Sequence, residues 1–350
     1  MLMVIFGAGA SFDSSAIHAV GPTLLYRPPL ANSLFEDRSE FLAARDSLPQ
    51  IHALIPQLMP HGDRSIEQTL QKYSDQATGD PLRTQQLLAV RYYLQEIFRA
   101  IIPAWLRQSG GFTNYDALLE QIRHHIRGSE PVCLVTFNYD TLLESALTAQ
   151  FKMTFDMLGD YISRADYKVF KLHGSQNWGK RVVSTPTMIF RGNHDPRGQH
   201  DVMIENIERI GVSDDDFAVY ETAASVGQFS GPPLYPAIAI PVATKTNSTF
   251  ECPAQHLRHL AELIPKVTKL LAIGWRGEEQ HFLEMLRKLP DGVGLNAVAH
   301  SVEAAEHTLG VIKSVCRAGD GAKAWAGFSA VVRDESLDDF FSTAGDVWPR

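Results

Sequence analysis

The chain has 350 residues, of which 45% are hydrophobic and 21% charged, which is enough for one large domain or two modest domains with a sizeable core. Its formal net charge of -8 and isoelectric point near 5.9 argue against a protein that mainly grips the nucleic acid backbone, because such proteins carry a basic excess. Cys133, Cys252 and Cys316 are too few and too widely spaced for a disulfide framework or a four-cysteine zinc site, and no apolar run approaches the roughly 20 residues of a membrane span. We therefore expect a soluble cytoplasmic protein that binds neither zinc nor a membrane and does not bind nucleic acid directly.

The N-terminal apolar run Leu2–Phe6 predicts a buried strand. It leads directly into Gly7-Ala8-Gly9-Ala10-Ser11, and glycines after a strand permit a tight turn in which backbone N–H groups approach a phosphate. A purely structural strand-to-helix turn is the alternative. A dinucleotide dehydrogenase would carry a carboxylate about 20 residues further on, but Tyr26-Arg27-Pro28-Pro29 lies there, so that class is disfavoured.

The next hundred residues carry helical signals. Prolines interrupt the segment from Gly21 to Leu30. Beyond it, Ser65-Ile66-Glu67-Gln68 has the pattern of a helix start, and residues 82–107 and 114–125 carry apolar residues at three-to-four spacing. We expect a helical insertion over about 31–128.

Two further strands are each followed by polar residues. Val132–Val135 precedes Thr136-Phe137-Asn138-Tyr139-Asp140, and Lys168–Leu172 runs into His173-Gly174-Ser175. An asparagine can bind ribose hydroxyls or position a water, and a histidine can act as a base near neutral pH. The alternatives are that Asn138 and Asp140 cap the helix starting near Thr141, and that His173 is structural.

The C-terminal half returns to alternating strands and helices. The segment 180–241, rich in glycine, proline and acidic residues, predicts a loop-rich insertion. After it the patterns predict strands at 236–244, 269–273 and 294–299 and helices at 256–266 and 278–288. The fold class is therefore α/β, a Rossmann-like doubly wound and mainly parallel sheet with a helical insertion. Because all three polar motifs follow strands, we expect them at one edge of that sheet, where open α/β sheets bind ligands.

Taken together, these motifs resemble the sirtuin superfamily and, more narrowly, the bacterial sirtuin-like proteins of antiphage defence. The resemblance includes Leu271-Ala272-Ile273-Gly274-Trp275 with Glu278 and Phe282, and Pro28-Pro29-Leu30 with Leu34-Phe35. It spans Leu2 to about Phe282, so the chain is expected to form a single sirtuin-like domain over 1–350.

The resemblance implies an NAD site and a role for each matching position. Asn138 would orient the nicotinamide ribose or the attacking water, His173 would be the base, and Asp140 would support the ribose-binding geometry. Gly274 and the turn after it would face the adenosine half of NAD, together with Trp275, Arg276 or Glu278. The NAD phosphates would lie against Gly7, Ala8, Gly9, Ala10 and Ser11.

The differences from deacetylating sirtuins indicate which branch of the sirtuin superfamily the chain resembles. Those enzymes carry a four-cysteine zinc module, a glutamine where this chain has Phe137, and a Gly-Ile-Pro-Asp-Phe-Arg-like stretch that does not follow Ser11 here. An acetyl-lysine groove is therefore disfavoured, and the resemblance implies an NAD glycohydrolase that depletes NAD in antiphage defence by abortive infection. Family members are held inactive as oligomers or by a partner, so we expect a homo-oligomer with a separately encoded HerA-type ATPase or short Argonaute.

Other functions remain open at this stage. The chain could bind NAD or ADP-ribose as a non-catalytic sensor or as a structural subunit of a defence complex, or it could be a protein deacylase. Gly192-Asn193-His194-Asp195 with His200 and Asp201 has the look of one metal-binding block of metallophosphoesterases. Two metal ions need ligands from several loops. The first and last ligand blocks of that family are missing from the chain, which disfavours this interpretation.

Overall fold

Six strands form one parallel sheet in the computed structural model of the chain, in the order β3-β2-β1-β7-β8-β9. The structure describes residues 1–15, 26–59, 65–125, 131–184, 196–220, 234–242 and 250–342. Strands β1, β2 and β7 are almost wholly buried, as their continuous apolar sequences predict for a sheet covered on both faces. The six strands are β1 (Leu2–Phe6), β2 (Val132–Thr136), β3 (Tyr167–Lys171), β7 (Lys269–Ile273), β8 (Gly294–Ala299) and β9 (Lys323–Ala326).

The direction in which strands are added to the sheet reverses at β1. From β1 the chain adds β2 and β3 on one side and β7, β8 and β9 on the other. Phe6 is in register with Thr136 of β2 and with Ile273 of β7, so the chain leaves these three strands at the same level. Open parallel α/β sheets bind their ligands in the crevice at such a reversal. The fold therefore places Gly7, Phe137 and Gly274 at its expected ligand site.

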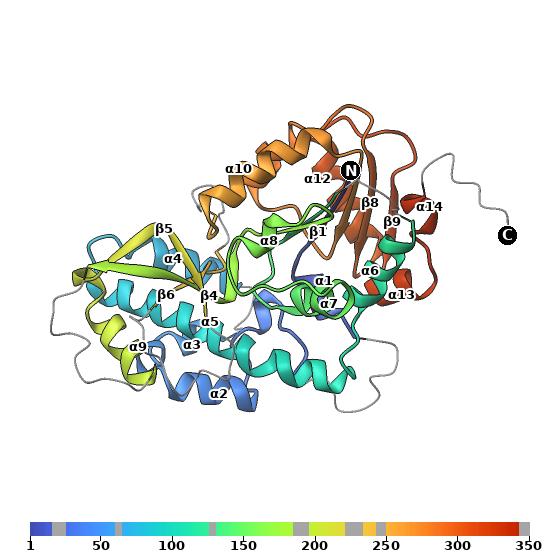
Figure 1. Cartoon of the computed structure of the whole chain (residues 1–350). Helices are drawn as coiled ribbons and strands as arrows, with labels where there is room; N and C mark the ends of the chain where they lie inside the picture. The colour runs from blue at the N-terminus through green and yellow to red at the C-terminus, as the bar shows by residue number, and fades with distance from the viewer. Residues whose placement is uncertain are drawn as a thin grey trace.

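Helices cover both faces of this sheet, which confirms the predicted doubly wound α/β class. Figure 1 shows α12 (Val302–Lys313), which packs against β8 and β9, on one side of these strands, and α6 (Asn114–His125) with α13 (Phe328–Arg333) on the other. The remaining helices associated with this sheet are α1 (Ala8–Phe12), α7 (Leu142–Phe151), α8 (Asp160–Ser163), α10 (Ala254–Leu263), α11 (Gln280–Leu286), α14 (Asp338–Phe341) and the 3-10 turn η6 (Ile264–Lys266).

The segment between β1 and β2 is helical. Helix α4 begins with the expected capping pair, in which Ser65 Oγ accepts from the Gln68 amide at 3.1 Å. The long helix α5 carries Arg91 and Arg99 along its length. Among the described residues, no helix is long and apolar enough to cross a membrane. The elements here, besides α1 and α6, are η2 (Ala31–Ser33), α2 (Ser39–Asp46), η3 (Pro49–Ile51), α3 (Ile55–Leu58), α4 (Ile66–Asp75) and α5 (Pro81–Gln108).

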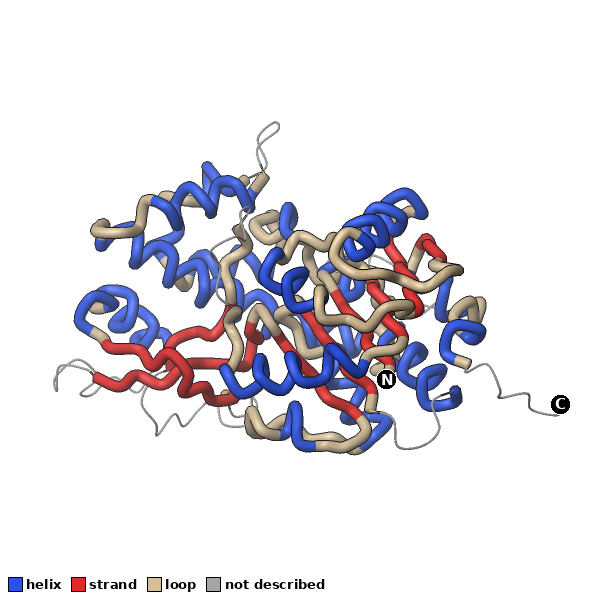
Figure 2. Tube along the Cα trace, turned by 90° about the horizontal axis from the view of Figure 1, so that it is seen from above, coloured by secondary structure: helices blue, strands red, loops and turns tan. Residues whose placement is uncertain are grey.

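Part of the segment predicted to be loop-rich forms a second, antiparallel sheet with the order β5-β4-β6. Its elements are β4 (Gly174–Ser184), α9 (Pro196–Glu205), η4 (Ile207–Arg209), β5 (Gly211–Val219) and β6 (Leu234–Ile238). Figure 1 shows most of this sheet beside α5, and Figure 2 shows its strands in red at the left of the view. Its strand β4 begins close to the six-stranded sheet, because only Leu172 and His173 separate it from β3. Gln95 of α5 donates from Nε2 to the carbonyl of Trp178 at 2.6 Å. Packing of this kind stabilises strands whose exposed acidic residues hide their pattern in the sequence; residues 185–195 and 221–233 lie outside the described part.

One buried histidine gives folding a pH dependence. His256 of α10 lies among Tyr161, Phe170 and Trp178, and its Nε2 lies 2.9 Å from the carbonyl oxygen of Leu158. Burial lowers the pKa of His256 to about 4, and the nearby imidazole of His259 acts in the same direction.

We expect stability to fall as the pH drops from about 6.5 toward 4. In that range the unfolded chain binds a proton on His256 that the folded chain excludes, so stability is complete above the unfolded pKa of about 6.5 and up to about 3 kcal/mol is lost below it. Urea unfolding between pH 4 and 8 measures this. His256→Gln should flatten the slope, whereas His124→Gln, at an exposed position on α6, should leave it unchanged. Identical slopes for wild type and His256→Gln would contradict the assignment.

Candidate functional site

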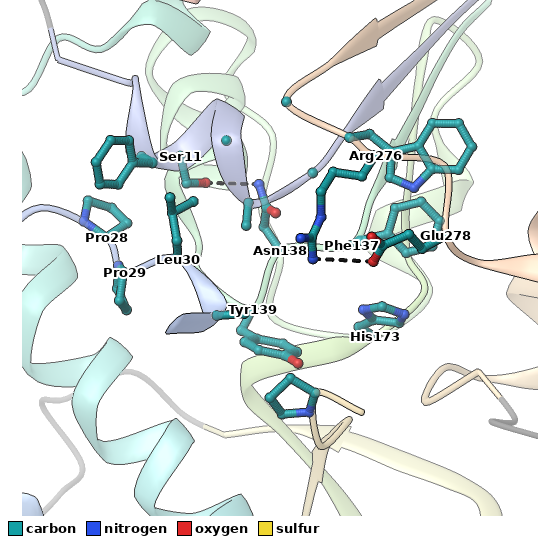
Figure 3. A pocket seen from close by; sticks show the side chains of 18 of the residues that line it. Ser11, Pro28, Pro29, Leu30, Phe137, Asn138, Tyr139, His173, Arg276 and Glu278 are labelled. Atoms are coloured by element: carbon teal, nitrogen blue, oxygen red, sulfur yellow. Dashed lines mark hydrogen bonds and ion pairs between the residues drawn. The ribbon is translucent and has the colours of Figure 1, made fainter. Parts of the chain in front are cut away.

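A cavity of about 860 Å³ lies at the carboxyl ends of the parallel strands. This volume is toward the upper end of the roughly 300–1,000 Å³ that small-molecule sites occupy. Figure 3 shows its interior, with Ser11 and Asn138 facing one another, His173 and Glu278 on the opposite side, and Pro28, Pro29 and Leu30 along a further wall. The residues predicted from the sequence that line it are Gly7, Ala8, Gly9, Ser11, Asn138, Asp140, His173, Gly274, Trp275, Arg276 and Glu278. Ala10 is fully buried and does not belong to the lining.

The glycine turn is held by direct contact with the turn after β7. The amide of Gly7 donates to the carbonyl of Ile273 at 3.0 Å, and the amide of Gly9 donates to that of Gly274 at 3.2 Å. A Cβ on Gly7 would lie 2.4 Å from the Gly274 oxygen, and one on Gly274, whose φ is +62°, would lie 2.2 Å from the nitrogen of Ala10. These glycines are therefore required by the close approach of two backbones.

Asn138 donates hydrogen bonds to the protein from its amide nitrogen, whereas its amide oxygen has no partner among the described residues. Its Nδ2 donates to Ser11 Oγ at 2.9 Å and to the Tyr115 hydroxyl at 3.1 Å, and those two hydroxyls are 2.8 Å apart. Burial keeps the pKa of Tyr115 well above its usual value, so this hydroxyl stays protonated. Asn138 Oδ1 is buried and accepts no hydrogen bond from the described residues. An oriented, buried acceptor at the cavity wall is suited to a hydroxyl group or a water of a ligand.

Asp140 has a capping role, and Asn138 does not. Asp140 Oδ1 accepts from the Leu142 amide at 3.0 Å at the start of α7, as the capping alternative expects. Its carbonyl also accepts from Lys171 Nζ. Lys171 forms a buried ion pair with Glu144 Oε1 at 2.9 Å, and burial raises the pKa of Glu144 although Lys171 opposes this effect. The pair fixes α7 to β3 beside Asp140.

His173 lies against an aromatic wall on the other side of the cavity. Its ring meets Phe137 edge-on at 4.9 Å, and Phe137 stacks on Trp275 with ring centroids 5.7 Å apart and an interplanar angle of 7°. The imidazole side chain is 15% exposed, so it is largely desolvated but accessible from the cavity. The Tyr139 ring lies 6.4 Å away, and burial raises the pKa of its hydroxyl. Both tyrosines of the site are therefore protonated at neutral pH.

The sequence did not single out Glu279 or Tyr115. Glu279 is 6% exposed and lines the cavity, and its Oε1 lies 3.9 Å from His173 Nε2. Its neighbour Glu278 instead pairs with the exposed Arg276 at 3.2 Å, as the dashed line in Figure 3 marks. Arg276 also reaches Glu67 of α4 at 3.1 Å. The only signal in the sequence was a pair of adjacent glutamates after a strand, and only the turn geometry distinguishes them.

Of the residues suggested for a metallophosphoesterase, His200 has other contacts. His200 stacks on Tyr92 with ring centroids 4.0 Å apart and pairs with Glu96 at 3.4 Å, whereas Gly192-Asn193-His194-Asp195 lies outside the described residues. Within the described ranges, no group of three His, Cys, Asp or Glu side chains is placed to hold a metal ion. Cys133, Cys252 and Cys316 are all free thiols.

The fold and the site define an α/β protein whose parallel strands end on one cavity, with an asparagine and a histidine on facing walls. The family model of the SIR2-like domain matches residues 132–306, half of the chain, and this match includes Asn138, His173 and Gly274. The chain belongs to the SIR2-like family, as the motifs predicted.

The chain is also similar to solved structures with which it shares little sequence identity. A mutant Sir2 homologue in complex with 2'-O-acetyl-ADP-ribose has 13% sequence identity and a TM-score of 0.39, with 99% of this chain and 94% of that chain covered. A Sir2 homologue in complex with NAD has 12% identity and a TM-score of 0.38, with 97% and 90% covered. No curated protein sequence matches this chain.

Proposed function

We propose that this protein is an NAD glycohydrolase that cleaves NAD to nicotinamide and ADP-ribose. The observation that carries the proposal is the convergence of Asn138, His173 and the glycine turn on one cavity at the strand-order reversal. These residues follow three separate strands, β1, β2 and β3, whose parallel pairing brings them together. The absence of a dehydrogenase-type carboxylate after the glycine turn and the departures from deacetylating sirtuins favour hydrolysis over hydride transfer or deacylation.

Each part of NAD is assigned to a different wall of the cavity. The nicotinamide ribose lies between Asn138 and His173, beside the Phe137 and Trp275 rings. The phosphates lie along the turn formed by Gly7, Ala8, Gly9 and Ser11, and the adenosine half extends past Gly274. Asp140 supports this wall indirectly, because its carboxylate caps α7 and its carbonyl binds Lys171.

The chemistry needs few protein groups. Nicotinamide leaves as a neutral molecule when the C1'–N bond breaks with its electron pair, so no general acid is required and the main task is to stabilise an oxocarbenium-like ribose. Asn138 Oδ1 accepts a hydrogen bond from the ribose or from the attacking water. Water adds to C1', and His173 takes its proton. The aromatic wall excludes bulk water from the charged nicotinamide ring.

We also propose a biological role, in which the protein depletes NAD in the cytoplasm during antiphage defence. In healthy cells it is held inactive as a homo-oligomer or by a HerA-type ATPase or short Argonaute partner. The sequence motifs shared with the defence branch support this extension. An active enzyme of this kind would harm its own host, so its activity has to be suppressed in healthy cells, and we propose that assembly does this.

The test is chromatographic quantitation of nicotinamide and ADP-ribose after incubation with NAD. We expect equal amounts of both products from the wild type and a loss of about 10²–10⁴-fold in rate for His173→Ala, the range for removing a general base. Binding of NAD without release, alone and with the candidate ATPase and DNA added, would instead identify a sensor. Unchanged rates in a folded His173→Ala variant would show that the site is misassigned.

A further inference from the structure

Glu279 is a buried carboxylate of the cavity to which neither the family motifs nor the mechanism above assigns a role. It is the N-cap residue of α11, and its backbone carbonyl accepts from the amides of Phe282 and Leu283, both at 3.0 Å. The cap role uses the backbone only, because the side chain accepts no capping hydrogen bond there. The carboxylate is therefore directed elsewhere.

Its two oxygens face two residues of the site. Oε2 accepts from the indole Nε1 of Trp275 at 2.5 Å, and Oε1 lies 3.9 Å from Nε2 of His173. Trp275 stacks on Phe137, which in turn packs against the His173 ring. Glu279 thus joins the aromatic wall and the imidazole into one unit.

Charge around His173 favours this pairing. Near the imidazole lie the carboxylate of Glu279 at the N-terminus of α11 and the ring of Tyr139 from the loop after β2, with the exposed Arg276–Glu278 pair at the side of the cavity. A carboxylate that is 6% exposed acts through a low local dielectric, so its interaction with a neighbouring imidazolium is much stronger than it would be in water. Carboxylates in this position orient a histidine and stabilise its protonated form.

We infer that Glu279 is the positioning residue for His173, an inference that rests on the proposed function. When ligand fills the cavity, the 3.9 Å separation shortens to a hydrogen bond, because catalytic contacts in ligand-free enzymes are often long. As water adds to C1' and the C1'–N bond breaks, the water proton passes to His173, and Glu279 stabilises the resulting imidazolium. Trp275 holds the carboxylate in the orientation that this requires.

The experiment compares wild type with Glu279→Gln, Glu279→Asp and the control Glu284→Gln. Glutamine keeps an acceptor for the Trp275 indole but removes the charge. Glu284 lies on the exposed side of the same helix and pairs with Arg287 at the surface. We expect kcat for Glu279→Gln to fall about 10–100-fold, the effect typical of groups that orient a functional histidine, with KM changed less than about threefold. The acidic limb of its pH profile should move to lower pH, Glu279→Asp should recover part of the rate, and Glu284→Gln should match wild type.

A second readout separates this inference from the proposed function. The imidazole resonance of His173, assigned by its loss in His173→Asn, is titrated by NMR in wild type and in Glu279→Gln. The midpoint should lie about one pH unit lower in Glu279→Gln because the imidazolium loses its counter-charge. Equal midpoints, or a wild-type rate and pH profile in Glu279→Gln, would overturn the inference. A wild type that never releases nicotinamide would overturn the proposed function, and the titration would still decide whether Glu279 controls His173.

Discussion

Replacing Asn138 with alanine is expected to lower the rate of nicotinamide release by about 10²–10³-fold, or about 3–4 kcal/mol in activation free energy. The amide is fixed at Nδ2 by Ser11 and Tyr115, so Oδ1 is held in one direction before any ligand binds. Preorganised polar groups contribute most in a desolvated site, because no reorganisation is needed during the reaction. Initial rates of nicotinamide and ADP-ribose formation at saturating NAD measure the effect.

The fold should survive this substitution. The hydroxyls of Ser11 and Tyr115 are 2.8 Å apart and keep their mutual hydrogen bond when the amide is removed, so we expect a stability loss of only about 1 kcal/mol. Asn206→Ala is the matched control, because its amide donates to the Val202 carbonyl at 2.9 Å and it does not line the cavity. A well-folded Asn138→Ala protein with the same rate as Asn206→Ala would remove Asn138 from the mechanism.

Gly274→Ala should be the most destabilising small change in the site. A Cβ here would lie 2.2 Å from the nitrogen of Ala10 and 2.6 Å from Gly9 Cα, and φ of +62° strains any residue with a side chain. Strain in this backbone region costs about 1–3 kcal/mol, and overpacking adds about 1–3 kcal/mol. We expect a loss of about 4 kcal/mol in the free energy of unfolding, measured by urea denaturation, together with loss of NAD binding as β1 and β7 separate at their ends.

The same substitution at Gly310 is expected to have the opposite effect on the free energy of unfolding. Gly310 lies on the exposed side of α12, and a Cβ there would meet nothing within 4 Å. Alanine should stabilise this helix by about 0.5–1 kcal/mol. Similar losses of unfolding free energy in both variants would mean that the contact between Gly274 and the glycine turn after β1 does not limit stability.

The local sequence was sufficient to place five of the six strands of the main sheet, whereas the edge strand β9 was not predicted. Leu2–Phe6, Lys269–Ile273 and Gly294–Ala299 were predicted with the bounds that the structure has, because strands buried on both faces are short, continuous apolar runs. Helix α6 was likewise predicted at 114–125. The exposed edge strand β5 was missed, since its central acidic residues carry no apolar pattern and its pairing with β4 determines its conformation.

The candidate site likewise has features that the sequence predicts and features that depend on the folded structure. The amino-acid pattern alone predicts that Gly7–Ser11, Asn138, His173 and Gly274 follow strands, and parallel topology then brings these positions to one edge of the sheet. Contacts that appear only once the chain is folded show that Gly7 and Gly9 serve the contact with Gly274, that Tyr115 orients Asn138, and that Glu279 lies beside His173. The physical reason is that apolar periodicity reports whether a residue is buried, whereas its partners depend on strand register and turn geometry, which are set by contacts between segments far apart in the chain.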